Sequence, residues 1–184
     1  MLNITKQAGD FDKYVKFNGK SGRWYMKNEA GEEVEITPAS FVADLENIKT
    51  GWMYFAAGTA PDKVFDASLT QPAPKPSDNH KRGFSLRLFS KGTFGGVVEL
   101  SGSSMHLCNA VNDLYGEFEA GKDKNPGKVP VVKYSGTTAQ KDKHGTNYKP
   151  NFVIEKWVDR PAELSGEDEK PAPAVVSSGS VSEF

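Results

Sequence analysis

Several short segments of the sequence place an aromatic residue within a few positions of a lysine or an arginine. Such pairs suit single-stranded nucleic acid, because a flat ring can stack on an unpaired base while a cation contacts a phosphate. One stacked base contributes roughly 1–3 kcal/mol, so three or four stacks would dominate the affinity. The candidate DNA-binding residues are Arg23, Tyr25, Lys27, Lys49, Trp52, Tyr54, Lys81, Arg82, Arg87, Phe89, Lys91, Lys133, Tyr134 and Tyr148.

Aromatic residues are also common in the cores of β proteins, so strand alternation must separate the two uses. In one alternating run, Phe89 shares its face with Arg87 and Lys91, whereas Phe84 shares the opposite face with leucines. This pattern predicts that Phe84 lies in the core and that Phe89 lies on a binding face lined by cations.

The same criterion applies to the earlier aromatic segments. It predicts that Tyr25 points outward and Trp24 inward. Trp52 and Tyr54 share one face of their segment, and the sequence leaves open whether that face is buried.

The sequence gives little support for catalysis. His80, His106 and His144 are scattered, and none has the spacing of a metal site. Cys108 has no base nearby in the sequence, so we expect a small buried residue. We expect His80 and His144 to be solvated in polar loops. The sequence therefore predicts neither an enzyme, nor a cofactor, nor a bound metal.

Most of the chain alternates polar and apolar residues with a period of two, which predicts strands. One helix is predicted from a serine cap at Ser103 or Ser104 to Gly121. Segments 59–82 and 136–149 are rich in proline or polar residues and are predicted to be irregular. The predicted strands cover residues 14–18, 23–27, 33–37, 45–55, 84–91, 96–100, 129–135 and 152–158.

A helix between the third and fourth main strands predicts a mostly β fold, a five-stranded Greek-key barrel called the OB-fold. Gly51 and the pair Gly95 and Gly96 would supply the bends. A sandwich would also fit the number of strands. The predicted domains are an OB-fold domain over residues 1–162 and a disordered acidic tail over residues 163–184.

The net charge of the 184 residues hides an uneven distribution. The 23 basic and 24 acidic residues divide into 22 and 19 in residues 1–162, and into 1 and 5 in the tail. A mildly basic body with an acidic tail is typical of nucleic-acid-binding proteins. The single cysteine excludes an intramolecular disulfide. The chain lacks a long apolar run, so we expect a soluble, cytoplasmic protein.

Segments 22–26, 44–52 and 79–83, with the detached acidic tail that ends in phenylalanine, together resemble the single-stranded-DNA-binding proteins of tailed bacteriophages. The resemblance implies an OB-fold that holds single-stranded DNA without sequence preference during replication, recombination and repair, in the host cytoplasm if the protein is phage-encoded. It also implies that the tail contacts replication and recombination proteins. The partner-binding tail residues would be Glu167, Asp168, Glu169, Glu183 and Phe184.

Two other functions remain open at this point. An OB domain of the same shape could bind RNA instead of DNA. A β-barrel of this size could also serve protein interaction or virion assembly without any nucleic acid. Competition between oligo-dT and RNA distinguishes RNA binding from DNA binding. The absence of any DNA binding would favour the protein-interaction or virion-assembly alternative.

Overall fold

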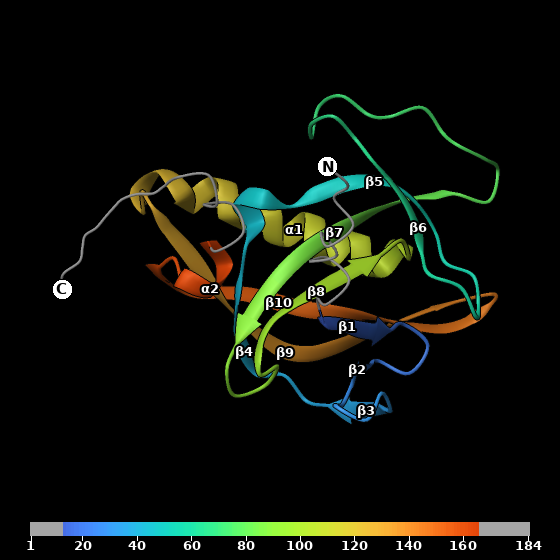
Figure 1. Ribbon diagram of the computed structural model, residues 1–184, viewed down its shortest axis with the longest axis horizontal. Helices are drawn as coiled ribbons and strands as arrows, with labels where there is room; N and C mark the ends of the chain where they lie inside the picture. The colour runs from blue at the N-terminus through green and yellow to red at the C-terminus, as the bar shows by residue number, and fades with distance from the viewer. Residues whose placement is uncertain (1–12, 166–184) are drawn as a thin grey trace, which may run out of the picture.

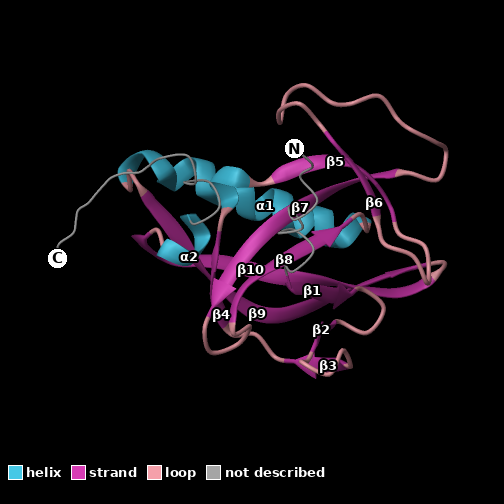
Figure 2. Ribbon diagram, in the orientation of Figure 1, coloured by secondary structure: helices cyan, strands magenta, loops and turns pink. Residues whose placement is uncertain are grey.

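The computed structural model describes residues 13–165, and the predicted tail residues 166–184 lie outside the described part, as do residues 1–12. The described chain forms a ten-stranded mixed sheet with one long helix packed against it (Figures 1 and 2). The strands are β1 (Lys13–Asn18), β2 (Arg23–Lys27), β3 (Glu33–Ile36), β4 (Ser40–Ala43), β5 (Lys49–Tyr54), β6 (Asp62–Phe65), β7 (Lys81–Ser90), β8 (Gly96–Gly102), β9 (Lys128–Asp142) and β10 (Gly145–Asp159). The helices are α1 (Met105–Gly121) and α2 (Ala162–Ser165), with short 3-10 turns η2 (Leu45–Asn47) and η3 (Lys122–Lys124).

Neighbouring strands follow the order β10-β9-β4-β7-β8-β1-β2-β3 across the sheet, and β5 and β6 branch from β7. β1 pairs with β8 in parallel, and the other pairs are antiparallel. Both β4 and β5 pair with β7, because the turn η2 bends the chain between them. β4 and β5 therefore act as one bent strand along β7.

The main core lies between α1 and the inner face of the sheet. Leu107, Val111, Leu114 and Phe118 are buried at the spacings of three and four that one helix face requires. From the sheet, Phe84 and Trp24 are buried, and Trp24 makes edge contacts with neighbouring aromatic rings. The helix and the inward positions of Phe84 and Trp24 are confirmed.

A second, smaller core lies on the outer face of the sheet and was not predicted. Leu164 of α2 is completely buried against Val42 and Val131, and Phe89 packs against this cluster partly buried. The prediction that Phe89 lies on an open face is therefore wrong, because α2 covers that part of the sheet. Folded structure also continues to residue 165, beyond the predicted domain boundary at 162.

Two segments predicted to be irregular contain strands. Residues 136–149 belong to the long β9–β10 hairpin, whose pairing continues to Asp142 and Gly145 beside the turn. Residues 59–82 contain β6, which pairs with β5. Backbone pairing defines these strands, and it leaves no pattern in a polar or proline-rich sequence. β4 was also missed, and the predicted strand 45–55 begins with η2, so β5 starts only at Lys49.

Candidate nucleic-acid interface

The register of β1, β2 and β3 defines a polar face that points away from the core. Lys16 lies opposite Tyr25, and Tyr25 lies opposite Glu35. Directly opposed residues point to the same side of a sheet, and neighbours along a strand point to opposite sides. Because Val15 and Trp24 are buried in the core, Lys16 and Tyr25 belong to the outer face.

A groove of about 1160 Å³ runs along β1, β2 and β3 and reaches the turn between β5 and β6. We call this space the groove and the β5–β6 hairpin, residues 49–65, the arm. The groove combines five aromatic residues with more basic than acidic side chains. The aromatic residues are Tyr14, Tyr25 and Phe55 together with the buried Phe17 and Phe94, the basic ones Lys13, Lys16, Lys27 and Lys63, and the acidic ones Glu29 and Glu33.

Carboxylates neutralise some of these cations. Lys16 Nζ lies 2.8 Å from Glu33 Oε2, and both side chains are exposed. An exposed pair of this kind contributes little to stability, so it can exchange for a phosphate at low cost. Lys27 is exposed and lies opposite Glu33 on β3, but Glu33 pairs with Lys16, and Lys27 forms no ion pair among residues 13–165. Of the sequence candidates, Tyr25 and Lys27 are therefore the pair that the structure places in the groove.

The arm is attached to the outer face through Lys63. Its Nζ donates hydrogen bonds to Glu99 Oε2 and Ser101 Oγ, both at 2.9 Å. The same ammonium group lies 5.3 Å from the centre of the Tyr14 ring, within cation–π range. Burial raises the pKa of Glu99, but hydrogen bonds from Ser85 and Lys63 outweigh it, so the pKa lies below its ordinary value.

A second cluster of candidates surrounds Trp52 of β5. Residues 66–80, the segment that follows the arm, contribute to this cluster, and we call this segment the strap. Arg82 lies over the Trp52 ring at 5.1 Å from its centre, and Lys75 at 5.6 Å. The Trp52 indole Nε1 donates a hydrogen bond of 2.7 Å to the carbonyl of Ala73. Trp52 therefore lies beneath the strap, and the cationic groups of Arg82 and Lys75 lie over its ring.

Asp66 is the anchor of the strap. Its side chain is only 2% exposed, and it accepts hydrogen bonds from both terminal nitrogens of Arg82, from Thr50 Oγ1 at 2.6 Å and from the Ala73 amide at 2.8 Å. The hydrogen bonds from Arg82, more than the others, hold the pKa of Asp66 far below its ordinary value. The guanidinium of Arg82 is thus committed to Asp66.

His80, expected to be solvated, is buried at the end of the strap. Its Nδ1 lies 2.7 Å from Ser77 Oγ, and its Nε2 lies 2.9 Å from Asp62 Oδ2. The exposed Tyr54 ring lies 5.7 Å from the imidazole. The prediction for His80 is wrong because both ring nitrogens find partners once the strap folds back onto β6. His80 therefore bridges Ser77 of the strap and Asp62 of β6.

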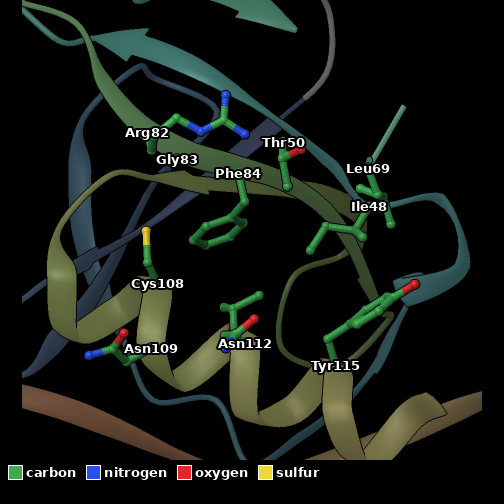
Figure 3. A pocket seen from close by; sticks show the side chains of 11 residues that line it. Ile48, Thr50, Leu69, Arg82, Gly83, Phe84, Cys108, Asn109, Asn112 and Tyr115 are labelled. Carbon is green, nitrogen blue, oxygen red and sulfur yellow. The ribbon is translucent and has the colours of Figure 1, made fainter. Parts of the chain in front are cut away.

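A cavity of about 430 Å³ separates α1 from β5 and β7 (Figure 3). Its floor is apolar, with Phe84 and Ile48, and Asn112 and Tyr115 approach it from the helix. Cys108 also lines it and is half-buried, and burial raises the pKa of its thiol. A thiol with a raised pKa is a weak nucleophile, so this cavity has no evident reactive group.

The remaining cationic candidates occupy other parts of the surface. Arg87 lies 3.8 Å from Asp44 and donates a hydrogen bond to the carbonyl of Leu164, so it fixes α2. Lys91 lies 3.8 Å from Glu163 of α2. Arg23 faces Glu35 at 3.4 Å. Arg23, Arg87 and Lys91 therefore each have a protein partner in this structure.

The last candidates divide between core and surface. Tyr134 and Tyr148 are partly buried against the main core, whereas Lys81 and Lys133 are exposed. Lys49 lies over the Phe65 ring at 5.4 Å. The candidates thus separate into the groove, the region of the strap, the surface near α2 and the β9–β10 hairpin, and they do not form one continuous site.

Sequence reasoning missed two aromatic and three basic residues of the groove, namely Tyr14, Phe55, Lys13, Lys16 and Lys63. Tyr14 and Lys16 flank a buried valine, so their alternation carried a usable signal that was overlooked. Lys63 lies in a segment whose flanking prolines argued against a strand. Only the tertiary fold brings Lys63 beside Tyr14.

Residues 13–165 contain no group of three or more histidine, cysteine or acidic side chains arranged to hold a metal ion. Among the helices of the same residues, none has both the length and the apolar character needed to cross a bilayer. Comparisons with protein-family models, with curated proteins and with solved structures found no match. The functional argument therefore depends on the geometry of the chain itself.

Proposed function

We propose that the protein binds single-stranded DNA without sequence preference, and without catalysing a reaction on it, in the service of replication, recombination and repair. The observation that carries the proposal is the groove, where Tyr14, Tyr25 and Phe55 lie among four lysines. Exposed rings can stack on unpaired bases, and lysines can contact the phosphates that connect them. Stacking accepts every base, which accounts for the lack of sequence preference.

The arrangement of strands supports an OB-type barrel. The bent strand formed by β4 and β5 pairs with β7 on one side, and through β4 with β9 on the other. α1 follows β8 and precedes β9, as a helix between the third and fourth main strands does. The amide of Tyr148 on β10 donates a 2.8 Å hydrogen bond to the Gly19 carbonyl, so the edge strand β10 contacts the β1–β2 turn from the other half of the sheet.

The position of the groove agrees with this proposal. OB-folds bind oligonucleotides on the face of their second and third strands, beside the loop that joins the first two. In this chain those strands are β7 and β8, and that loop contains the turn of the arm. The groove is lined by Ser101 of β8 and by Phe55 and Lys63 of the arm. The groove therefore adjoins the end of β8 and the loop between the first two main strands, and most of its other lining residues belong to β1, β2 and β3.

Fluorescence anisotropy with labelled oligo-dT tests the proposal. We expect Tyr25→Ala and Lys27→Ala to weaken binding. The loss of a stacking ring in Tyr25→Ala should cost about 1–3 kcal/mol of binding free energy. Lys124→Ala removes an equally exposed charge from η3, away from the groove, and should leave the affinity unchanged. Equal affinities of all three variants would remove the groove from the proposal.

A competition arm addresses the alternative ligand. Unlabelled oligo-dT should displace the probe at a lower concentration than oligo-U of equal length. Displacement by oligo-U at the lower concentration would assign the groove to RNA. No binding of either strand at low salt would instead favour a protein-interaction function.

A further inference from the structure

An acidic residue occupies the outer face where a phosphate-binding surface is proposed. Glu99 lies on β8 directly opposite Tyr14 of β1 and Arg87 of β7. A carboxylate at this position repels the phosphates of DNA unless its charge is neutralised. Its side chain is 17% exposed, so it lies beneath the surface of this face.

Every described partner of Glu99 Oε2 donates a hydrogen bond to it. The donors are the hydroxyl of Ser85, the ammonium of Lys63 at 2.9 Å and the hydroxyl of Ser101 at 3.0 Å. Ser101 Oγ also accepts a hydrogen bond from Lys63 at 2.9 Å. Charge-assisted bonds of this kind are stronger than neutral ones and fix the position of the cation.

This network determines where the arm lies. Lys63 belongs to β6, which pairs only with β5 among the described strands, so the outer end of the arm has no sheet partner on its other side. The Lys63 side chain is 14% exposed, although lysine is usually solvated. Its contacts with Glu99 and Tyr14 therefore connect the arm to β8 and β1, across the groove.

The tethered arm restricts what can reach the rings. The Tyr14 ring is 52% exposed, and the Lys63 ammonium of the arm lies 5.3 Å from its centre, so the arm lies beside a ring of the groove. A single strand can present unpaired bases to the rings of the groove. In a duplex the bases are paired and stacked, and presenting one requires its extrusion from the helix.

We propose that Glu99 is a positioning residue that holds Lys63 over Tyr14, so that the closed arm makes the groove selective for single-stranded over double-stranded DNA. This inference rests on the proposed function. It assigns to Glu99 an effect through the arm and no direct contact with DNA. Loosening the arm opens the groove, and the phosphates of a duplex can then approach the lysines.

The ratio of affinities for single-stranded and duplex DNA of equal length, measured at one salt concentration, tests this inference. Glu99→Gln is nearly isosteric and removes the charge that holds Lys63. We expect it to lower the ratio by about three- to tenfold, the range that corresponds to a cation–π contact and its ordering. Lys63→Met should lower the ratio similarly, and Lys63→Arg should restore most of it.

Lys124→Met is the matched control, because it removes one exposed lysine that lies outside both the groove and the arm. It should leave both affinities and their ratio unchanged. Thermal unfolding of each variant shows that the fold persists.

Two results would overturn the inference. If Glu99→Gln raises both affinities in parallel with an unchanged ratio, Glu99 acts only by repelling phosphate. If Lys63→Met leaves the ratio unchanged, the arm does not control selectivity. Failure of the wild-type protein to bind single-stranded DNA would instead reject the proposed function, so the two failures are distinguishable.

Discussion

Asp66 holds the guanidinium of Arg82 against the face of the Trp52 indole, and it does so with an almost fully buried carboxylate. This pair closes the strap over a residue that the sequence marks as a stacking candidate. Removing Asp66 leaves Arg82 without its partner and releases the Ala73 amide.

We predict that Asp66→Ala destabilises the protein by about 2–3 kcal/mol, the range for losing hydrogen bonds to a charged group. It should also increase acrylamide quenching of tryptophan fluorescence, because the strap no longer covers Trp52. Asp113→Asn, which breaks the exposed pair with Lys149, is the control and should change neither quantity noticeably. Identical quenching in Asp66→Ala and the wild type would show that the strap does not depend on Asp66.

The lowered pKa of Asp66 predicts a pH dependence of stability. The pKa in the folded state lies below the ordinary value of 3.8, so the carboxylate stabilises the fold fully above about pH 4. That contribution is lost as the pH falls through the interval toward the folded-state pKa. Denaturant unfolding of the wild type and Asp66→Asn from about pH 6 to about pH 3 should show a stability difference that shrinks with acidity. A difference that stays constant over this range would contradict the assignment.

The two phenylalanines of β7 test the two cores. Phe84→Ala should cost about 3–5 kcal/mol, because Phe84 is buried in the main core. Phe89→Ala should also destabilise the protein, by about 2 kcal/mol, since a half-buried ring loses less contact area. Urea unfolding measures both. If Phe89→Ala retained full stability and lost only DNA affinity, Phe89 would face the ligand as the sequence pattern indicated.

Two truncations separate α2 from the acidic tail. Ending the chain after residue 161 removes Leu164 from its cluster and should cost about 2–5 kcal/mol. Ending it after residue 165 keeps Leu164 and should leave stability unchanged. A differential scanning experiment on both proteins provides the comparison, and equal melting temperatures would show that α2 contributes nothing.

The longer truncation product also tests the tail. Residues 166–184 contain four acids and one base, a net charge of −3, and they follow the proposed DNA-binding domain in the sequence. A tethered anion competes with phosphate at high effective concentration, most strongly at low salt. We expect the protein that ends at 165 to bind oligo-dT more tightly at low salt, and to lose capture of replication partners that recognise Phe184. Unchanged affinity and capture would indicate a tail that serves solubility only.

The periodic elements were accessible from the sequence, and the elements without periodicity were not. The spacing of Leu107, Val111 and Leu114 marked α1 correctly, and alternation placed Phe84 and Trp24 inside. The distal half of the β9–β10 hairpin has no apolar alternation, so only its backbone pairing reveals it. Leu164 is a lone apolar residue in a polar stretch of sequence, and nothing in its sequence neighbours indicates that it packs against valines of β4 and β9.

The candidate site shows the same division. Tyr25 and Lys27 were found because both lie on one strand, where alternation reports the face. Lys63 and Glu99 are 36 residues apart, and a contact at that separation leaves no local pattern. Arg82 and Arg87 were plausible phosphate ligands by type, but the sequence does not show that Asp66 and Asp44 engage them.

The central claim, that the groove holds single-stranded DNA, is tested most directly by the salt dependence of oligo-dT affinity. If lysines of the groove neutralise phosphates, the logarithm of the association constant should fall linearly with the logarithm of salt, by roughly 0.7 per phosphate contact. Lys27→Ala should reduce the slope by about one contact, whereas Lys124→Ala should leave it unchanged. A wild-type protein that fails to bind at low salt, or binds with an affinity independent of salt, would contradict the account.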